Sequence, residues 1–276
     1  MTFIHLTDTH LNAPSNGSFL QMDAIGQLRE VVRHIQSMPF KPAFAVISGD
    51  LAHEGSVDDY RFIRDLLEHE SQALGVPILA ALGNHDHRAP FNEGFLGISG
   101  SSQAYYYTRE FDGLRVIVLD SHWDGHHAGL VSDEQIEWLK QQLSVRAPRG
   151  TVLVLHHPPH LNSLMELTGH PLANAAELAA ALVGSDVIAI LSGHVHMTSI
   201  STINGILSVT SQSTAFGLDP LVTTGMRMIE TYGYSLCLLN ENGLIVQPFE
   251  LPSSRREILY MSRQQIAAFM EKSAAE

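Results

Sequence analysis

The chain has 276 residues, of which 45% are hydrophobic, and its formal net charge at pH 7 is -13. This length suits one large α/β domain or a domain with an appendage, and the acidic balance excludes a broad basic surface for a nucleic-acid polymer. An anionic substrate would therefore need bound cations to supply positive charge. The one cysteine, Cys237, excludes an internal disulfide and fits a reducing compartment.

The chain begins without a basic region followed by a long apolar core, and none of its apolar runs is long enough to span a bilayer. We therefore expect a cytoplasmic protein with no signal peptide and no membrane partner. Because no repeat or linker divides the chain, we expect one domain over residues 1–276. Within it, 211–276 is expected to form a C-terminal extension that could supply contacts in a homodimer or a larger homo-oligomer.

The first part of the chain alternates apolar runs with amphipathic helical patterns. Strands are expected at 3–7, 43–47 and 76–81, and helices at about 21–37 and 57–74. This alternation is typical of a parallel sheet with crossover helices. Each strand is followed by side chains with oxygen or nitrogen donors: Asp8 and His10, then Asp50, and then the run Asn84-His85-Asp86.

The second part continues this pattern after an expected loop at 87–104. Two buried strands are expected at 151–155 and 187–191, and they end in His156-His157 and in His194-Val195-His196. The other expected elements are paired strands at 105–109 and 114–119, helices at 133–144 (capped by Ser132) and 173–182, hairpins over 199–210 and 234–249, irregular segments at 160–172 and 211–231, and a helix or interaction arm at 263–276.

Seven nitrogen and oxygen donors thus lie at the ends of five expected strands. They are Asp8, His10, Asp50, Asn84, His156, His194 and His196. Seven donors are too many for one tetrahedral zinc, but they suit two cations such as Mn, Fe, Zn or Co about 3.5–4 Å apart. No thiolate is among them, which argues against an iron–sulfur site. Asp50 stands alone on its turn and is the natural carboxylate to bridge two ions.

The ordered set Asp8-x-His10, Gly49-Asp50, Gly83-Asn84-His85-Asp86, His156 and Gly193-His194-x-His196 resembles the calcineurin-like metallophosphoesterases. The resemblance covers residues 6 to 196. It implies an αββα sandwich, in which helices flank two facing sheets, and a two-metal phosphoester hydrolase. It also assigns Asp8, His10 and His196 to one metal and Asn84, His156 and His194 to the other, with Asp50 bridging. The choice of His156 over His157 comes from this resemblance.

Within that family, the runs 46–53 and 156–159 are most similar to the class III cyclic nucleotide phosphodiesterases and the glycerophosphodiesterases. The residues after Asp50 and the Asp86 that follows His85 depart from the protein Ser/Thr phosphatases. The resemblance therefore implies hydrolysis of a small phosphodiester through in-line attack by a hydroxide held at the metals. The alternatives are a phosphomonoesterase or nuclease of the same fold, or a scaffold that has lost catalysis.

Other polar residues beside these motifs are weaker candidates. His85 could protonate the leaving alkoxide or bind a phosphoryl oxygen together with Asn84, and Asp86 could orient His85 or brace the turn. His53 could line the pocket. Arg88 and His87 could contact the substrate, although a solvated loop is the simpler interpretation. His122, His126 and His127 form either a pocket rim or a solvated loop, and we favour the latter.

Overall fold

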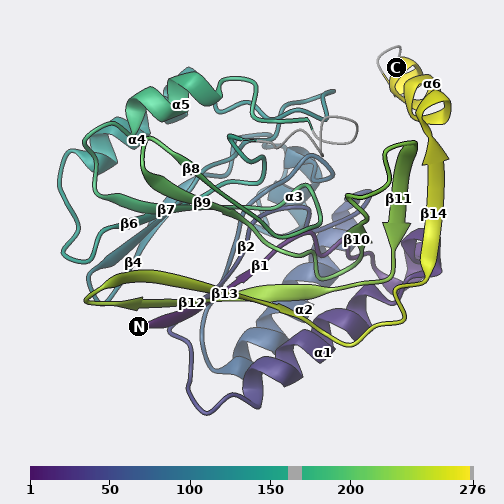
Figure 1. The fold of residues 1–276 in the computed structure, drawn as a ribbon, viewed down its shortest axis with the longest axis horizontal. Helices are drawn as coiled ribbons and strands as arrows, with labels where there is room; N and C mark the ends of the chain where they lie inside the picture. The colour runs from purple at the N-terminus through teal and green to yellow at the C-terminus, as the bar shows by residue number, and fades with distance from the viewer. Residues whose placement is uncertain (161–169, 274–276) are drawn as a thin grey trace.

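A computed structural model describes residues 1–160 and 170–273 and the side chains up to residue 268 (Figure 1). Its centre is a pair of facing sheets. The first sheet has five strands in the order β13-β12-β1-β2-β3, and its three parallel strands are β1, β2 and β3. The bounds are Thr2–Leu6 for β1, Ala45–Ile47 for β2, Ile78–Ala80 for β3, Gly233–Asn240 for β12 and Gly243–Glu250 for β13.

The second sheet has six strands in the order β4-β5-β6-β7-β9-β8. Its four middle strands are parallel, and β4 and β8 pair antiparallel at the two edges. The bounds are Tyr107–Phe111 for β4, Leu114–Val118 for β5, Thr151–Val154 for β6, Val187–Ser192 for β7, Ser199–Ile203 for β8 and Ile206–Thr210 for β9.

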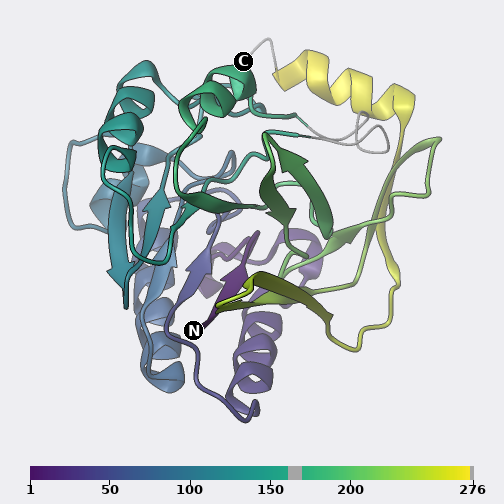
Figure 2. The same cartoon turned by 60° about the vertical axis from the view of Figure 1, so that its left-hand side comes forward.

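Helices cover the outer face of each sheet, as Figures 1 and 2 show. Helices α1 (Ala24–Gln36) and α2 (Val57–Leu74) pack on the five-stranded sheet, and α4 (Asp133–Leu143) and α5 (Ala175–Ala181) pack on the six-stranded one. The inner faces of the sheets bury apolar residues against each other: Phe3, Val46, Val116, Val154 and Cys237 are among them. The expected αββα sandwich is therefore confirmed.

Local side-chain and backbone signals set the ends of two helices. The Ser56 side chain and Asp59 form a reciprocal capping box at the start of α2, and Gly75 ends that helix in a left-handed conformation. Ser132 caps α4 by accepting a hydrogen bond from the backbone N–H of Gln135. These caps fix where the two helices begin, and therefore where the preceding loops can run.

The C-terminal part differs from the expectation. Strands β12 and β13 lie in the five-stranded sheet, so residues 233–250 belong to the central sandwich and not to an extension. Outside the sandwich lie a small sheet of β10 (Gly217–Leu218), β11 (Gly225–Ile229) and β14 (Glu257–Ser262), and helix α6 (Arg263–Ser273) at the end of the arm seen in Figure 1.

Other elements were missed. The segment 211–231, expected to be irregular, contains strands β10 and β11. Residues 88–94, expected as loop, form helix α3 (Arg88–Gly94), and β14 was not expected at all. The expected irregular segment 160–172 lies mostly outside the described residues. Among the described helices, none is long and apolar enough to cross a membrane.

Candidate metal centre

Five parallel strands of the two sheets end at one place. The turns after β1, β2 and β3 carry Asp8 and His10, Asp50, and Asn84, and the turns after β6 and β7 carry the three histidines His156, His194 and His196. Because β1–β3 belong to one sheet and β6 and β7 to the facing one, the donors meet across the interface between the sheets. The site therefore depends on both halves of the sandwich.

The first group of donors contains Asp8, His10, Asp50 and His196, all of which are buried. His10 Nε2 lies 3.1 Å from His196 Nε2 and 3.6 Å from Asp50 Oδ2. Asp8 Oδ1 lies 3.3 Å from His196 Nε2. Atoms that share an ion at a bond length of about 2.0–2.2 Å must lie roughly 3.0–3.5 Å apart, and these separations are close to that range.

The second group is centred on Asn84. Its Oδ1 lies 2.8 Å from His194 Nδ1 and 3.2 Å from His156 Nε2. Asp50 Oδ2 lies 3.3 Å from the same His156 nitrogen, so one carboxylate oxygen of Asp50 faces both groups. This is the position that a bridging ligand would need.

Backbone strain is concentrated at these residues. Five of the seven donors have a left-handed backbone conformation: Asp8, His10, Asp50, His194 and His196, with φ values of 51°, 43°, 51°, 74° and 51°. Such values are uncommon for residues other than glycine, and each costs about 1–3 kcal/mol unless the surroundings impose it. The strain is typical of a functional site and turns consecutive side chains toward one point.

Two glycines allow the turns to approach this closely. A Cβ on Gly83 would overlap the carboxylate of Asp50, and a Cβ on Gly193 would overlap the Thr7 hydroxyl. Neither glycine has a positive φ among the described backbone values, so their role is close approach and not an unusual conformation.

The electrostatics of the site favour positive charge between its carboxylates. Burial lowers the pKa of His10 well below its ordinary value and that of His194 to about 3, so both rings are neutral and able to ligate at pH 7. Burial would also lower the pKa of His156, but Asp50 and Asp8 outweigh it and raise this pKa to about 9. A cation could take the place of that proton.

Two of the histidines donate to a backbone carbonyl on the side facing away from the centre. Nδ1 of His156 donates to the carbonyl of Ser48 at 2.9 Å, and Nδ1 of His196 donates to the carbonyl of Phe216 at 3.0 Å. These bonds place the proton of the neutral ring on Nδ1 and direct Nε2 at the site. His10 differs, because its Nδ1 meets Nδ1 of His53 at 3.2 Å.

His157, unlike His156, has no ring nitrogen directed at the metal centre. Its Nδ1 faces the hydroxyl of Ser121 at 2.8 Å, and its Nε2 donates to the carbonyl of His127 at 3.1 Å. Both ring nitrogens are thus used by the protein, which is a structural reason to prefer His156 as a ligand. The sequence spacing alone could not distinguish the two.

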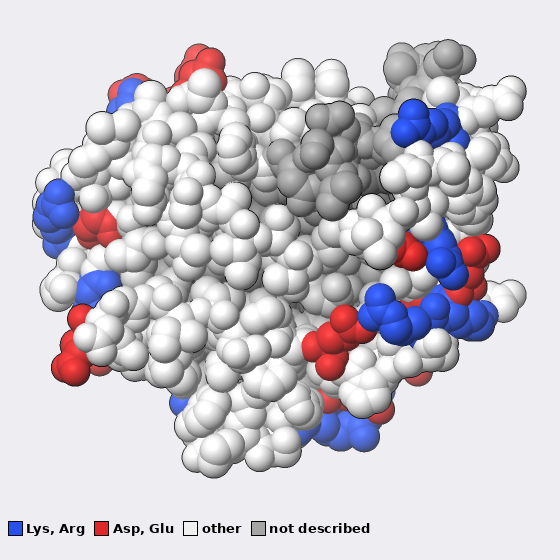
Figure 3. Space-filling model, viewed as in Figure 1, with Lys and Arg blue, Asp and Glu red and all other residues white. Residues whose placement is uncertain are grey.

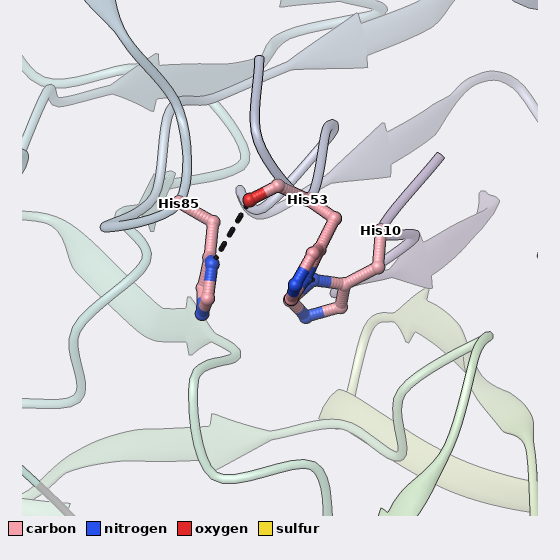
Figure 4. A group of neighbouring side chains, drawn as sticks. All are labelled: His10, His53 and His85. Carbon is pink, nitrogen blue, oxygen red and sulfur yellow. Dashed lines mark hydrogen bonds between the residues drawn. The ribbon is translucent and has the colours of Figure 1, made fainter. Parts of the chain in front are cut away.

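His85 is half-buried and lies beside His10 and His53 (Figure 4). Its ring Nδ1 donates to the carbonyl of His53 at 3.1 Å, and its backbone N–H donates to Asp50 Oδ1 at 2.9 Å. The ring centroid is 4.9 Å from that of His10. The remaining nitrogen, Nε2, is therefore available for a substrate.

Asp86 is fully buried and braces the turn instead of contacting the His85 ring. Its carboxylate accepts hydrogen bonds from the backbone N–H groups of Leu51, Ala52 and Gly83 at 2.8–3.1 Å and from the hydroxyl of Tyr60 at 2.9 Å. It thereby joins the turn of Asp50 to the turn of Asn84. Burial and the charge of Asp50 raise the pKa of Asp86 to about 6.

Two expectations are corrected in part: that Arg88 contacts the substrate, and that the loop carrying His122, His126 and His127 is solvated. The Arg88 guanidinium donates to Asp120 at 2.9 Å and to the carbonyl of His122 at 2.7 Å, which favours a bracing role over contact with substrate. His122 is buried, with Nδ1 3.1 Å from the carbonyl of Gly83, so it is not part of a solvated loop. His126 is exposed, as expected.

A cavity of about 350 Å³ opens beside His10, and the sequence analysis did not identify it. Its wall includes Asn12, Phe19, Met22 and Ile25. Asn12 Oδ1 is buried and has no hydrogen-bond partner among the described residues. No motif marks this segment, although the aromatic and apolar residues next to Asp8-x-His10 were a usable hint.

The surface gives no sign of a site for a polyanion on the face in Figure 3. Lys and Arg there are interspersed with Asp and Glu, mostly near β11 and β14. The ion pairs Arg227–Asp219, Arg227–Glu257 and Arg256–Glu230 account for much of this charge. The described part of this face therefore carries no basic stripe.

Comparison with known proteins agrees with this geometry. The family model described as calcineurin-like phosphoesterase matches residues 1–198, which include all seven donors. The chain belongs to the calcineurin-like phosphoesterase family. The resemblance inferred from the sequence is thus confirmed.

Two relatives of this calcineurin-like phosphoesterase cover 80% of the chain. A probable cyclic nucleotide phosphodiesterase of Rhodococcus erythropolis is 38% identical, and 73% of its length is matched. A cAMP/cGMP dual specificity phosphodiesterase of Mycobacterium tuberculosis is 35% identical, and 70% of its length is matched. A dimetal phosphatase from Danio rerio has the same fold, with a TM-score of 0.65 and 15% identity over 95% of this chain and 99% of that one.

Proposed function

We propose that this protein is a two-metal phosphodiesterase that hydrolyses small phosphodiesters, with cyclic nucleotides as the favoured class. The observation that carries the proposal is the position of Asp50 Oδ2, which lies 3.6 Å from Nε2 of His10 and 3.3 Å from Nε2 of His156. Asp8 and His196 complete the first group of ligands, and Asn84 and His194 complete the second. Manganese and iron are the metals we expect, with zinc or cobalt as alternatives.

Two bound cations would supply an activated water as nucleophile and would neutralise the charge on the phosphoryl oxygens. The protein supplies the proton for the leaving group. His85 is suited to this step, because its Nδ1–H is bound to the His53 carbonyl at 3.1 Å and its Nε2 is left to carry the transferred proton. Asn84 would combine ligation with a contact to a phosphoryl oxygen.

A diester fits this site better than a monoester. A monoester dianion gains from Arg side chains that grip its extra charge, and Arg88 already pairs with Asp120 at 2.9 Å. A diester carries one negative charge, which two cations neutralise unaided. The cavity beside His10 offers room for the organic group, which the sequence analysis had not located.

A nucleoside is a better match for that cavity than a glyceryl group. Phe19 in its wall could stack on a base, and the side chain of Asn12, which lines the same wall, offers a polar group to that base. The names of the two relatives support the same class. The expectations of a cytoplasmic location, of a single domain over residues 1–276 and of homo-oligomer contacts in 211–276 belong to this proposal as well.

The test is a substrate screen with the protein reconstituted with Mn after chelation. We expect turnover of 3′,5′-cyclic AMP to exceed that of glycerophosphoethanolamine, and Asn12→Leu to reduce this preference. The control is Asn240→Leu on β12, which lies away from the cavity. No diester turnover in any metal-loaded sample would favour a scaffold, and preferred cleavage of single-stranded DNA would favour a nuclease.

A further inference from the structure

We propose that His53 is a positioning residue, which determines how tightly the first metal is held by fixing the ring of His10. The proposal rests on the proposed function, because it assumes that His10 ligates the first metal. His53 itself is not needed as a ligand. Its ring lies behind His10, on the side opposite to Asp50 and His196.

The chemistry of His10 creates the need for such a partner. The side chain of His10 is 1% exposed, and its Nε2 faces Asp50 and His196. A neutral imidazole that ligates through Nε2 must carry its proton on Nδ1, and a buried N–H requires an acceptor. Nδ1 of His53, at 3.2 Å, is that acceptor, so the proton of His53 lies on its Nε2.

Two other histidines of the metal centre have a backbone acceptor for this proton instead of a side chain. His156 and His196 donate to the backbone carbonyls of Ser48 and Phe216. A backbone carbonyl is present whatever side chain stands there. Of the rings of His10, His156 and His196, only that of His10 has a side chain as the acceptor for its Nδ1 proton. A substitution at position 53 could therefore change the first metal site without replacing a ligand.

The surroundings hold His53 in one orientation. Its ring stacks on Phe19 with centroids 3.7 Å apart at 29°, and it lies nearly parallel to the ring of His85, at 4.9 Å and 24°. The residues just before it are tied down, because the backbone N–H groups of Leu51 and Ala52 donate to Asp86. The acceptor is therefore preorganised before a metal arrives.

His53 also links the metal centre to the proton donor. Figure 4 shows its ring next to His10 and its backbone carbonyl bound by His85. The ring thus serves the metal ligand, and the carbonyl serves His85. A side-chain substitution removes the first contact and leaves the second in place, which separates the two effects.

A third metal bound by His10, His53 and His85 is the competing interpretation, since one nitrogen of each lies within 4.8 Å of the others. However, Nδ1 of His85 is already bound to a carbonyl. The rings of His53 and His85 are also nearly parallel, so their in-plane lone pairs do not converge on one ion. The hydrogen-bonded role of His53 is therefore preferred.

Three variants separate hydrogen bonding from stacking. His53→Asn keeps an acceptor, because Asn Oδ1 is as many bonds from the backbone as His Nδ1. His53→Phe keeps an aromatic ring but cannot accept, and His53→Ala keeps neither. His69→Asn, at an exposed position on α2, is the matched control. Mn affinity is measured by competition with a chelator, and metal content by elemental analysis.

We expect His53→Phe and His53→Ala to bind the first metal about 10- to 100-fold more weakly and the second metal as the wild type does. His53→Asn and His69→Asn should bind both metals like the wild type. If His53→Phe does not fold, the difference between His53→Asn and His53→Ala decides the question. A merely structural role would not be rescued by Asn.

The outcomes also separate this proposal from the proposed function. A wild-type protein that binds fewer than two metals would refute the two-metal function itself. A wild-type protein with two metals, together with His53→Phe and His53→Ala variants that hold both equally tightly, would overturn only the role of His53. A third metal equivalent that disappears in His53→Ala would also overturn it, in favour of a third site.

Discussion

The hydroxyl of Tyr60 donates a 2.9 Å hydrogen bond to the carboxylate of Asp86, and this contact joins helix α2 to the turn that carries Asn84. Both side chains are fully buried. Because Asp86 also accepts three backbone N–H groups, it holds two turns of the metal centre together. The geometry of the centre thus depends on a carboxylate that faces away from it.

We predict that Asp86→Asn lowers the free energy of unfolding by about 1–3 kcal/mol, because an amide presents N–H where three backbone donors need an acceptor. Tyr60→Phe should cost a similar amount, about 1–3 kcal/mol, because its hydroxyl donates to Asp86 and accepts from the backbone N–H of His87 at 2.9 Å, and both bonds are lost. Urea unfolding of the metal-free protein measures both, with Glu68→Gln on the exposed face of α2 as the control. Unchanged stability with lost turnover in Asp86→Asn would point to a catalytic role.

We predict different metal losses at the two sites. Asp50→Ala should weaken both sites, because its Oδ2 faces both groups of donors, whereas Asn84→Ala should mainly weaken the second. Elemental analysis after reconstitution with Mn gives the metal content per chain. The bridging assignment fails if Asp50→Ala retains both metals and full activity.

The residues alone predicted parallel strands whose terminal donors meet, whereas the αββα sandwich was implied by the family resemblance. The apolar runs before Asp8, Asp50 and Asn84 have the composition of buried strands, and chain connectivity makes such strands parallel. Parallel strands bring their C-terminal turns to one edge, so donors far apart in sequence could be expected to meet. Gly83 and Gly193 each stand next to a donor at a strand end, which the sequence shows. The close contacts that exclude a side chain at these two positions are visible only in the structure.

The residues that support the centre were not predictable in this way. The helical pattern of α2 indicates that Tyr60 faces the core, but not that its hydroxyl finds Asp86. Strand β14 escaped detection although Pro252-Ser253-Ser254 precede it, because its four apolar residues in a row, 258–261, do not alternate with polar ones and fit a helix as well as a strand. Likewise, the cavity wall around Phe19 depends on how residues 12–25 lie against the rest of the fold.

His85→Ala should keep the metals and slow hydrolysis, by roughly 10²–10⁴-fold for substrates with alkoxide leaving groups. The loss should be small for nitrophenolate, which leaves without protonation. Steady-state rates with a cyclic nucleotide and with bis-nitrophenyl phosphate provide the comparison. Equal losses with both substrates would instead favour binding of a phosphoryl oxygen by His85.

We expect a pH dependence of the metal-free protein from His156. Asp50 and Asp8 outweigh the effect of burial and raise its pKa to about 9, above the ordinary value of 6.5. A raised pKa means that the stabilising contribution of the protonated ring is complete below pH 6.5 and is lost as the pH rises through 9. The Tm of the chelated protein should therefore fall over this interval.

The metal-loaded protein should not show the same loss, because a ligating imidazole carries no proton on its ligating nitrogen at any pH in this range. Thermal melts from pH 6 to 9.5, with and without Mn, make this comparison. Parallel pH profiles for the two forms would argue against metal ligation by His156.

The most direct test of the central claim is the ratio of kcat/KM for bis-nitrophenyl phosphate to that for nitrophenyl phosphate, measured with the Mn-reconstituted protein. Both substrates release the same phenolate, so the ratio reports how the site distinguishes a diester from a monoester dianion. With Arg88 paired to Asp120, we predict a ratio well above one. A ratio below one, together with a monoester preferred over 3′,5′-cyclic AMP, would contradict the assignment as a phosphodiesterase.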